Sequence, residues 1–364
     1  MNILGLCLSR GKGGLESYAF KAISALNKAG HECHFAVSPN GAFREFERTI
    51  PSIEIQLLFP HLPVLAARKL ADYIDTHQID IIHMHWNKDL TLAAMSKWFS
   101  RRKPKLVYTR HMEITRSKKD FYHRVLYSQV DCLLANAQFV LEQAIRFLPM
   151  AMEKIKLLYL GVGTTPVVTP EQCKSLLLQS GENEDAYVIG MIGRIEHGKG
   201  QHVLIEAMDI LQQQNLRPLV AMVGPIMDKT YYNRLIQQIS EKNLTRCVKY
   251  LGVSSEPQKL MSCCDVVVLT TYCETFGLVL VEAMRVGTAV IGSNAGGVPE
   301  IIEHEKTGML YEPGNASELA DCLAELCRNK VKRENLARAG KEFADLMFDE
   351  NRHFAHLAEI LENL

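Results

Sequence analysis

Short apolar runs alternate along this chain with segments in which apolar residues return every three or four positions. The runs are rich in Val, Ile and Leu, which predicts strands buried on both faces. In the segments between the runs, the three- or four-residue spacing of the apolar positions predicts amphipathic helices. Strands that alternate with helices in this way are typical of βαβ units and parallel sheets. In the first half, the predicted strands are Asn2–Leu8, His31–Val37, Ile53–Leu57, Ile79–Met84, Lys105–Thr109, Asp131–Ala135 and Ile155–Leu158.

A second series of the same kind begins after residue 186. Its predicted elements are the strands Tyr187–Ile192, Pro218–Val223, Arg246–Leu251 and Asp265–Leu269 and the helices Gln201–Gln214 and Tyr231–Lys242. Further helices are predicted from Asn315 onward, and the last covers Glu350–Leu364. Residues 159–186 include GVGTTPVVTP and SGENED and predict the connection between the two series, with a short helix over Glu171–Gln179. The chain is therefore predicted to be an α/β protein.

The length of 364 residues exceeds what one ordinary core fills, so two domains are expected. The composition, with 47% hydrophobic and 23% charged residues and no apolar run of about eighteen residues, predicts a soluble globular enzyme. The opening MNILGLCLSRGKGG has no basic residue before its apolar run and predicts a first strand instead of a signal peptide. The ten cysteines form no C-x-x-C pair, which predicts buried thiols and a cytoplasmic protein.

Charge is shared unevenly between the two halves. Residues 1–160 contain 22 Lys and Arg and 14 Asp and Glu, a balance of +8, and the rest of the chain carries the opposite balance. A basic half can attract a phosphorylated glycan or the anionic inner face of a membrane. The plain alternative is a solvated surface with nothing bound. No nucleic-acid partner is predicted.

The most informative stretch begins at Cys273 with CETFGLVLVEAM, in which Glu274 and Glu282 lie eight positions apart. A helix that starts near Gly277 would present unpaired backbone N–H groups and a positive dipole end, which bind phosphate well. Glu282 would lie little more than one turn inside this helix, and Glu274 just ahead of it. Two acids placed around a phosphate site fit a nucleotide sugar, whose ends carry hydroxyls.

Several further motifs follow in a fixed order. GTAVIGS predicts a buried strand, and NAGG predicts a turn in which Gly296 and Gly297 allow a close backbone approach. The segments VPEII and TGMLYEPGN follow this turn. This combination of E-x7-E, EAM, GGxPEII and TGMLYEPGN resembles the donor-binding half of the retaining GT-B glycosyltransferases of glycosyltransferase family 4. The resemblance extends over nearly the whole chain. It implies two Rossmann-like domains with an interdomain cleft.

GRIEHGKGQ, from Gly193 onward, places Arg194 and Lys199 five apart in a glycine-containing loop after a strand. Two such cations can neutralise a diphosphate leaving group, and an ion-paired loop is the structural alternative. The spacing is similar to that of family 4, in which these cations hold the donor diphosphate. The Lys-Gly pair is not followed by Ser or Thr, so the loop differs from a magnesium-binding P-loop. The resemblance implies that no metal or other cofactor is needed.

In the first half, Gly13, Gly14 and Glu16 follow the first strand and are similar to a GGxE segment of family 4. The pattern G-x-G-G is not the G-x-G-x-x-G of dinucleotide-binding proteins, so either a tight turn or a loop that approaches the donor or acceptor is expected. His83 and His85 share one face of a strand end. They have no evident third ligand for a metal nearby, and the resemblance implies a structural or acceptor-side role.

His111 follows the predicted strand KLVYT, at the edge where α/β proteins place their sites. A histidine there can hydrogen-bond a sugar hydroxyl or change its charge near neutral pH, and a satisfied surface histidine is the alternative. By resemblance, it contacts the transferred sugar. Lys118 and Lys119 are candidates for binding an anionic acceptor, although a solvated loop with Asp120 as a helix cap explains them equally.

The predicted activity is that of a retaining, metal-independent hexosyltransferase that uses a nucleoside-diphosphate sugar, with UDP-sugars preferred over GDP-mannose. Arg194, Lys199 and the amides of Phe276, Gly277 and Leu278 would bind the diphosphate. Glu282 would bind the ribose. The transferred sugar would be bound by Glu274, with Thr275 beside it, and by His111. The acceptor would be a glycan or a lipid-linked glycan, as in the synthesis of lipopolysaccharide or another surface polysaccharide, with possible peripheral membrane contact.

The resemblance is incomplete at one point, because the chain has Leu160-Gly161-Val162-Gly163 where family 4 often has Asn-Gly-Val-Asp. The residues that read the base are not identified either, which leaves UDP and GDP open. Two alternatives have different chemistry: a UDP-sugar epimerase of GT-B fold, and a two-lobed sugar-binding protein without catalysis. The predicted domains are residues 1–165, completed by the helix 350–364, and residues 166–349.

Overall fold

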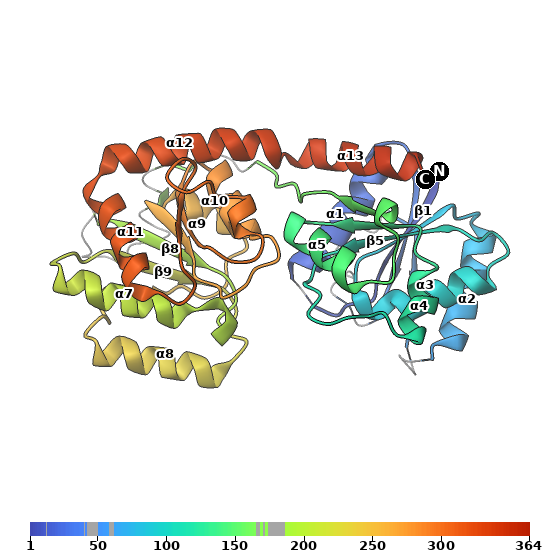
Figure 1. Ribbon diagram of the computed structural model, residues 1–364, viewed down its shortest axis with the longest axis horizontal. Coiled ribbons are helices and arrows are strands. Elements are labelled where there is room, and N and C mark those ends of the chain that lie inside the picture. The colour runs from blue at the N-terminus through green and yellow to red at the C-terminus, as the bar shows by residue number, and fades with distance from the viewer. Residues whose placement is uncertain are drawn as a thin grey trace. The chain divides into compact units, whose positions relative to one another are not determined.

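The computed structural model describes residues 1–11, 13–39, 41, 50–57, 62–164, 168–169, 172–173 and 186–364. These residues form two compact units, each with its own parallel sheet (Figure 1). Unit 1 consists of Met1–Gly161 and Glu350–Leu364, and unit 2 of Val162–Asp349. The short helix predicted over Glu171–Gln179 falls outside the described residues, apart from Gln172 and Cys173. The predicted α/β class is confirmed.

The sheet of unit 1 has the strand order β3-β2-β1-β4-β5-β6-β7. Its strands are β1 (Asn2–Cys7), β2 (Glu32–Val37), β3 (Ser52–Glu54), β4 (Ile81–Met84), β5 (Lys105–Arg110), β6 (Cys132–Ala135) and β7 (Ile155–Leu157). Every residue of β4 and β6 is buried, as their apolar runs predict. The chain order reverses between β1 and β4, which pair in parallel from Ile3 with Ile81. Ligands of open α/β sheets bind at the carboxyl ends of strands beside such a reversal.

The helices of unit 1 follow the predicted alternation. They are α1 (Gly14–Lys28), α2 (Val64–Thr76), the 3₁₀ turn η2 (Asn87–Asp89), α3 (Leu90–Phe99), α4 (Phe121–Tyr127), α5 (Gln138–Phe147), the turn η3 (Met152–Lys154) and α13 (Glu350–Glu362). The last helix packs against the first, because Tyr18 Oη lies 2.9 Å from His353 Nε2 and Lys21 Nζ donates to Glu350 at 2.7 Å. Helix α13 therefore belongs to the core of unit 1, although it lies more than 300 residues from α1.

The sheet of unit 2 has the order β10-β9-β8-β11-β12-β13, so its chain order reverses between β8 and β11. The strands are β8 (Val188–Ile192), β9 (Leu219–Val223), β10 (Val248–Tyr250), β11 (Val266–Leu269), β12 (Ala289–Ser293) and β13 (Met309–Tyr311). The helices and turns are η4 (His197–Lys199), α7 (Gln201–Gln213), α8 (Lys229–Glu241), α9 (Pro257–Ser262), α10 (Leu278–Arg285), η5 (Val298–Glu300), α11 (Ala316–Arg328) and α12 (Lys330–Met347). No helix within the described residues is long and apolar enough to cross a membrane.

The two ends of unit 2 are tied together by Arg285, a buried residue at the end of α10. Its guanidinium donates to the carbonyls of Val162 and Phe348 and to Asp349 Oδ2, the last at 3.1 Å. Val162 also donates its amide to Phe348 O at 2.9 Å. This is the segment in which the chain departs from the Asn-Gly-Val-Asp pattern, and its backbone is satisfied without those side chains.

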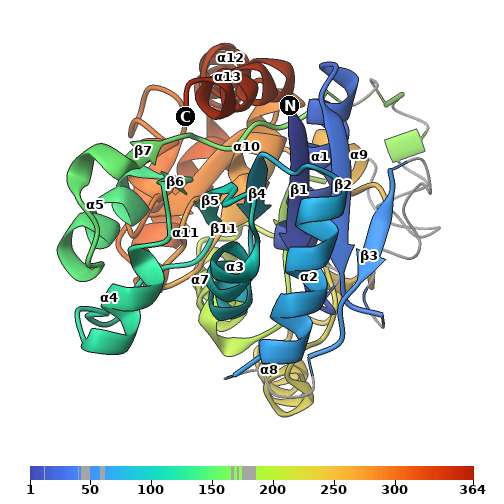
Figure 2. The same cartoon turned by 90° about the vertical axis from the view of Figure 1, so that its right-hand side faces the viewer.

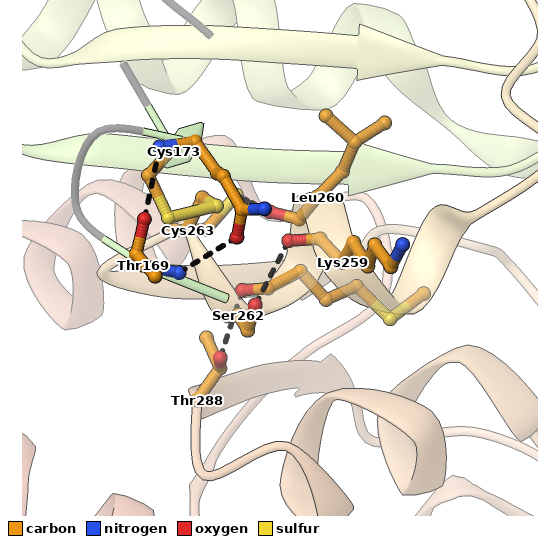
Figure 3. Close-up of a disulfide and its surroundings, with 10 residues drawn as sticks. Thr169, Cys173, Lys259, Leu260, Ser262, Cys263 and Thr288 are labelled. Atoms are coloured by element: carbon orange, nitrogen blue, oxygen red, sulfur yellow. Dashed lines mark hydrogen bonds between the residues drawn. A yellow bond between two sulfur atoms is a disulfide. The ribbon is translucent and has the colours of Figure 1, made fainter. Parts of the chain in front are cut away.

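One expectation about the cysteines is wrong. Cys173 and Cys263 form a disulfide with their Cα atoms 5.2 Å apart, within the usual range for this bond (Figure 3). Cys263 follows α9, whose last residue, Ser262, donates to Lys259 O. The bond joins residues 90 positions apart, and no local spacing could indicate that pair. The other eight cysteines are free thiols.

A thiol titration of the unfolded chain should therefore give eight reactive thiols per molecule before reduction and ten afterwards. Alkylation in denaturant with mass readout measures this count, and the oxidised peptide should contain Cys173 and Cys263. Ten thiols in protein purified under oxidising conditions would contradict the pairing. Cys173→Ser should leave nine.

Candidate functional site

Lys199 and Glu274 meet at the carboxyl edge of the sheet of unit 2. Lys199 ends the turn after β8 and Glu274 lies in the loop after β11, and these strands flank the reversal of chain order. Lys199 Nζ and Glu274 Oε2 are 2.5 Å apart, and the side chains are 20% and 21% exposed. The structure thus brings together two predicted residues that are 75 positions apart in the sequence. Because each is partly shielded from water, their charges act more strongly than on an open surface.

Two buried threonines hold the Lys199 loop against the end of β11. Thr270 Oγ1 donates to Lys199 O at 2.8 Å, and Thr271 Oγ1 donates to Gly198 O at 3.1 Å. Gly200 follows with a φ of 68°, and a Cβ there would come within 2.1 Å of Thr270 O. Only glycine fits such a position. Sequence reasoning missed these threonines, although their place directly after a buried strand was a signal.

The loop of Glu274 is held from its other side by the NAGG turn. Gly297 donates its amide to Glu274 O at 2.8 Å, and a Cβ at Gly296, whose φ is 60°, would lie 2.1 Å from the same oxygen. The close approach predicted at these glycines is therefore to the protein's own loop. The turn fixes the backbone that carries Glu274 and Thr275.

Helix α10 begins at Leu278, which confirms the predicted start near Gly277, and Gly277 itself has a left-handed conformation. Phe276 is buried and packs edge-on against Phe348, with ring centroids 5.4 Å apart. Glu282 lies in the second turn of the helix and is half-buried. The positive end of α10, whose first backbone N–H groups can bind an anion, thus follows the Glu274 loop directly.

Arg194 is the more exposed of the two predicted cations. Its guanidinium is 56% exposed and lies 2.9 Å from Glu196 Oε1, and its carbonyl accepts from Gln201 Nε2 at 2.8 Å. The backbone of this loop is therefore fixed, whereas the side chain is paired at the surface. Such a pair is weak and can be exchanged for a diphosphate at small cost.

A cluster of rings lies beside the Lys199 loop and was not predicted. His202 contacts Tyr231 Oη through Nδ1 and Tyr272 Oη through Nε2, both at 2.9 Å. The ring of Tyr272 is parallel to that of His197, at 6.0 Å between centroids. Burial, and then the imidazole of His197, lowers the pKa of His202. The cluster supports the loop that carries Lys199.

In unit 1, Gly13 caps α1 and Glu16 completes a capping box. Glu16 accepts from the amide of Gly13 at 2.9 Å through Oε2 and from Ser9 Oγ through Oε1. The carboxylate is buried. Glu16 and Gly14 therefore shape a tight turn at the end of β1, which is the structural alternative expected for this segment.

His85, His111 and His353 lie around Tyr18 near the reversal of chain order between β1 and β4, and His83 lies beside His85 with ring centroids 4.2 Å apart. The ring of Tyr18 is 4.8 Å from that of His111 and 5.6 Å from that of His85. His83 Nε2 lies 2.7 Å from Thr109 Oγ1, and His353 Nδ1 lies 2.6 Å from the carbonyl of Tyr159. Of these imidazoles, His83, His85 and His353 are buried and His111 is half-buried. Sequence reasoning missed Tyr18 and His353.

These imidazoles are neutral at pH 7. Burial, and then the neighbouring imidazole of His353, lowers the pKa of His83 to about 3. Burial, followed by His83, His353 and Arg110, lowers the pKa of His111 to about 3, and burial lowers that of His353 to about 4. Of the two roles predicted for His111, hydrogen bonding by a neutral ring therefore agrees with its surroundings, and a change of charge near neutral pH does not.

This cluster predicts a loss of stability in acid. The histidines titrate near pH 6.5 when unfolded and only near pH 3 to 4 when folded, so the unfolded chain binds more protons in between. The stability that these neutral histidines contribute is fully present above pH 6.5. As the pH drops below 6.5, the free energy of unfolding should decrease by about 1.4 kcal/mol per pH unit for each histidine. Urea unfolding at pH 7.0 and 5.5 measures this. His83→Gln should reduce the slope, and an unchanged urea midpoint would contradict the assignment.

Asp89 is a further buried group at this edge that was not predicted. Its Oδ2 accepts from the amide of Leu8 at 2.9 Å, and Oδ1 has no hydrogen-bond partner within the described residues. Burial raises the pKa of Asp89 to about 7. The residue links the end of β1 to η2 and can hold or release a proton near neutral pH.

Lys118 and Lys119 lie in the loop that leads into α4. Asp120 caps this helix by accepting from the amide of His123 at 3.2 Å, as the structural alternative predicts. Lys119 O accepts from Arg124 Nε, and Lys118 is partly buried. In the part of the chain that the structure describes, no three His, Cys, Asp or Glu residues are grouped so that they could hold a metal ion.

Two family models match consecutive parts of the chain. Glycosyltransferase Family 4 matches residues 12–165, and Glycosyl transferases group 1 matches residues 176–343. The chain is also 24% identical over 334 residues to N-acetyl-alpha-D-glucosaminyl L-malate synthase of Bacillus anthracis, which covers 87% of this chain and 85% of the relative. It is 30% identical over 185 residues to the amylovoran biosynthesis glycosyltransferase AmsK of Erwinia amylovora, 48% of this chain and 44% of AmsK.

A solved structure is similar over the whole chain. HepE of Anabaena, in complex with UDP-glucose, is 27% identical, with a TM-score of 0.85 and coverage of 100% of both chains. The same protein in complex with UDP gives a TM-score of 0.86.

Proposed function

Because the chain belongs to the group 1 glycosyltransferases and is an enzyme of GT-B fold that transfers sugars, we propose that it uses a nucleoside-diphosphate sugar, with UDP-sugars preferred over GDP-mannose. The observation that carries this proposal is the Lys199–Glu274 pair. The two residues follow β8 and β11, between which the chain order of the sheet reverses, and Glu274 lies shortly before the start of α10. The UDP and UDP-glucose complexes of HepE support it.

In this proposal, the donor diphosphate lies against Lys199, Arg194 and the first amides of α10, at Phe276, Gly277 and Leu278. Lys199 exchanges its contact with Glu274 for a phosphate oxygen, which frees the carboxylate to accept from a sugar hydroxyl. Negative charge that develops on the leaving diphosphate is then stabilised by cations and dipoles fixed in advance. Glu282 binds the ribose.

Transfer would proceed with retention and without metal. His111, with a neutral ring, donates to or accepts from the sugar, and the leaving phosphate takes the proton of the acceptor hydroxyl. The departing oxygen and the attacking oxygen share one face of the sugar, so the anomeric configuration is kept. Two cations supply the charge that a metal ion provides in other transferases.

The acceptor is proposed to be a glycan or a lipid-linked glycan of a surface polysaccharide, such as lipopolysaccharide. The basic balance of residues 1–160 supports an anionic acceptor or a membrane contact, and the similarity to AmsK supports polysaccharide synthesis.

Proton NMR of the product formed from UDP-glucose and a lipid-linked or phosphorylated glycan tests the reaction. An α-linked product formed in the presence of EDTA is expected. A β-linked product would refute retention, and activity that disappears with EDTA would refute metal independence. A change of the donor sugar to its epimer would instead identify an epimerase.

A further inference from the structure

The Cys173–Cys263 disulfide joins the segment that precedes β8 to the end of α9 (Figure 3). Cys173 lies between the two parts of the chain that the family models match, residues 12–165 and 176–343. Its amide donates to Thr169 O at 3.0 Å, and Thr169 donates its own amide to Gln172 Oε1 at 3.0 Å. The described residues of this segment thus bond to one another, and the disulfide ties them to a helix of unit 2.

Helix α9 is fixed in turn to α10, the helix whose first amides belong to the proposed donor site. Met261 of α9 is fully buried, and its carbonyl accepts from Thr288 Oγ1 at 2.8 Å. Thr288 follows α10 and donates its amide to Ala283 O at 3.0 Å. The two helices pack against each other on the side of the sheet away from α8 (Figures 1 and 2). A movement of α9 therefore reaches α10.

Helix α10 is short and is held at its end. It has eight residues and is therefore about 12 Å long, so a shift at its last turn also moves its first amides. Arg285, its last residue, donates to Val162 O and to Asp349. The segment that leads into unit 2 is thus tied to α10 twice, directly at Val162 and through the disulfide and α9. Of these two ties, the disulfide is the one that a chemical reaction can open.

The thiols nearby do not compete for this bond. Cys264 follows Cys263 directly, and burial, and then the charge of Asp265, raises the pKa of Cys264 to about 12. Burial also raises the pKa of Cys132 and of Cys322 to about 11. Because the thiolate is the attacking form in disulfide exchange, these thiols are inert towards the disulfide at neutral pH. An added dithiol therefore opens the bond without rearranging it.

We propose that the Cys173–Cys263 disulfide is a thiol-exchange site that sets the affinity of unit 2 for its nucleoside diphosphate. Both cysteines are half-buried, so a small dithiol can reach the bond. One thiolate of the dithiol attacks one sulfur and expels the other cysteine, and the second thiol then displaces the first cysteine and closes a cyclic disulfide. Two electrons pass from the dithiol to the protein, and its two protons end on the two cysteines.

The cysteine pattern favours a bond that opens and closes. One disulfide stands beside eight thiols. Secreted domains that depend on disulfides carry several, whereas disulfides in reducing surroundings are mostly transient or redox-sensing. The inference rests on the proposed function, because the property under control is diphosphate binding at the start of α10. A bond kept for stability alone is the alternative.

Calorimetric titration of the full chain with UDP, before and after treatment with dithiothreitol, tests this control. Reduction should weaken UDP binding roughly fivefold or more, the usual size of coupling between two linked sites. Reoxidation of the same sample with oxidised glutathione should restore the affinity, which separates control from misfolding. Cys173→Ser and Cys263→Ser should each bind UDP as the reduced protein does and should not respond to dithiothreitol.

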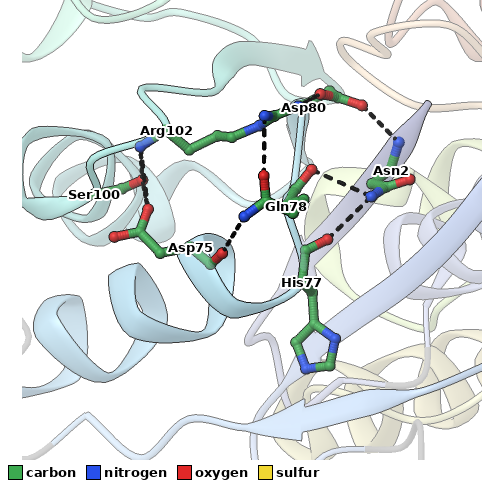
Figure 4. A network of polar contacts seen from close by, with 7 residues as sticks. All are labelled: Asn2, Asp75, His77, Gln78, Asp80, Ser100 and Arg102. Atoms are coloured by element: carbon green, nitrogen blue, oxygen red, sulfur yellow. Dashed lines mark hydrogen bonds and ion pairs between the residues drawn. The ribbon is translucent and has the colours of Figure 1, made fainter.

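Two further variants serve as controls. Cys247→Ser removes a half-buried cysteine of unit 2 that forms no disulfide, and it should keep the full response to reduction. Arg102→Ala breaks contacts within unit 1, with Asp80 and with Gln78 Oε1, the latter at 3.1 Å (Figure 4). It should lower Tm and leave UDP binding unchanged, so it separates a general loss of stability from control of the donor site.

The possible results distinguish this inference from the proposed function. If the oxidised and reduced forms bind UDP equally tightly, the disulfide is structural, and the donor site stands without the thiol-exchange site. A bond that dithiothreitol does not open in the native protein would overturn the inference in the same way, and so would an equal loss of UDP binding in Arg102→Ala. If neither form binds UDP, the proposed donor site fails and the inference fails with it.

Discussion

Replacement of Lys199 by alanine is expected to reduce kcat/KM for glycosyl transfer by about a hundredfold, the effect typical of losing one fixed group that stabilises charge in the transition state. The ammonium lies 2.5 Å from Glu274 and is only 20% exposed, so its charge is partly shielded from water and acts more strongly than on an open surface. The substitution also leaves Glu274 without this partner, which adds repulsion against the diphosphate. Arg194→Ala should cost more than tenfold, and less than Lys199→Ala, because the Arg194 side chain is more exposed.

Lys242 provides a matched control for this variant. It pairs with Asp209 in unit 2 at 2.7 Å, and the two side chains are exposed to a similar extent as Lys199 and Glu274. Lys242→Ala should change stability by about as much as Lys199→Ala and leave kcat/KM within about twofold, since surface pairs contribute little. Steady-state kinetics and thermal unfolding measure both quantities. Equal activity of the Lys199→Ala and Lys242→Ala variants would remove Lys199 from the site.

The second large effect is expected at Gly200, where the backbone permits no side chain. A Cβ would lie 2.1 Å from Thr270 O, and the φ of 68° adds strain for any other residue. Gly200→Ala should therefore displace the Lys199 loop from the end of β11. We expect a loss of about 2 to 4 kcal/mol in the unfolding free energy of unit 2 and at least roughly tenfold weaker binding of UDP.

Gly198 is the control within the same loop, because a Cβ there would meet no atom within 4 Å. Gly198→Ala should keep both the melting temperature and UDP binding close to those of the unaltered chain. Differential scanning calorimetry and calorimetric titration with UDP compare the two variants. If Gly200→Ala bound UDP as tightly as Gly198→Ala does, the loop geometry would not matter for the donor.

Local patterns predict the elements well because their causes are local. The apolar run at residues 79–84 becomes β4, and the helix expected near Gly277 begins at Leu278. Asp120 is predictable as a helix cap because capping depends only on neighbouring residues, and Asp is favoured directly before the first turn of a helix. Charge, spacing and turn residues therefore indicate the candidate loops from the amino-acid sequence alone.

Contacts between distant segments were not accessible in the same way. Lys199 and Glu274 were predicted separately, but their ion pair depends on β8 and β11 becoming neighbours in the sheet. Tyr18 and His353 are 335 positions apart, and their contact requires α13 to pack on α1. Asp89 follows β4 and accepts from the amide of Leu8 after β1, a contact between segments about 80 positions apart, and its burial there raises its pKa.

Calorimetric titration of the purified chain with UDP in the presence of EDTA tests the central claim most directly. We predict binding at one site per chain without metal, and loss of that binding in Lys199→Ala but not in Lys242→Ala. A chain that binds no nucleoside diphosphate, and instead binds free sugars equally well with and without Lys199, would contradict the donor site proposed at the β8 and β11 edge.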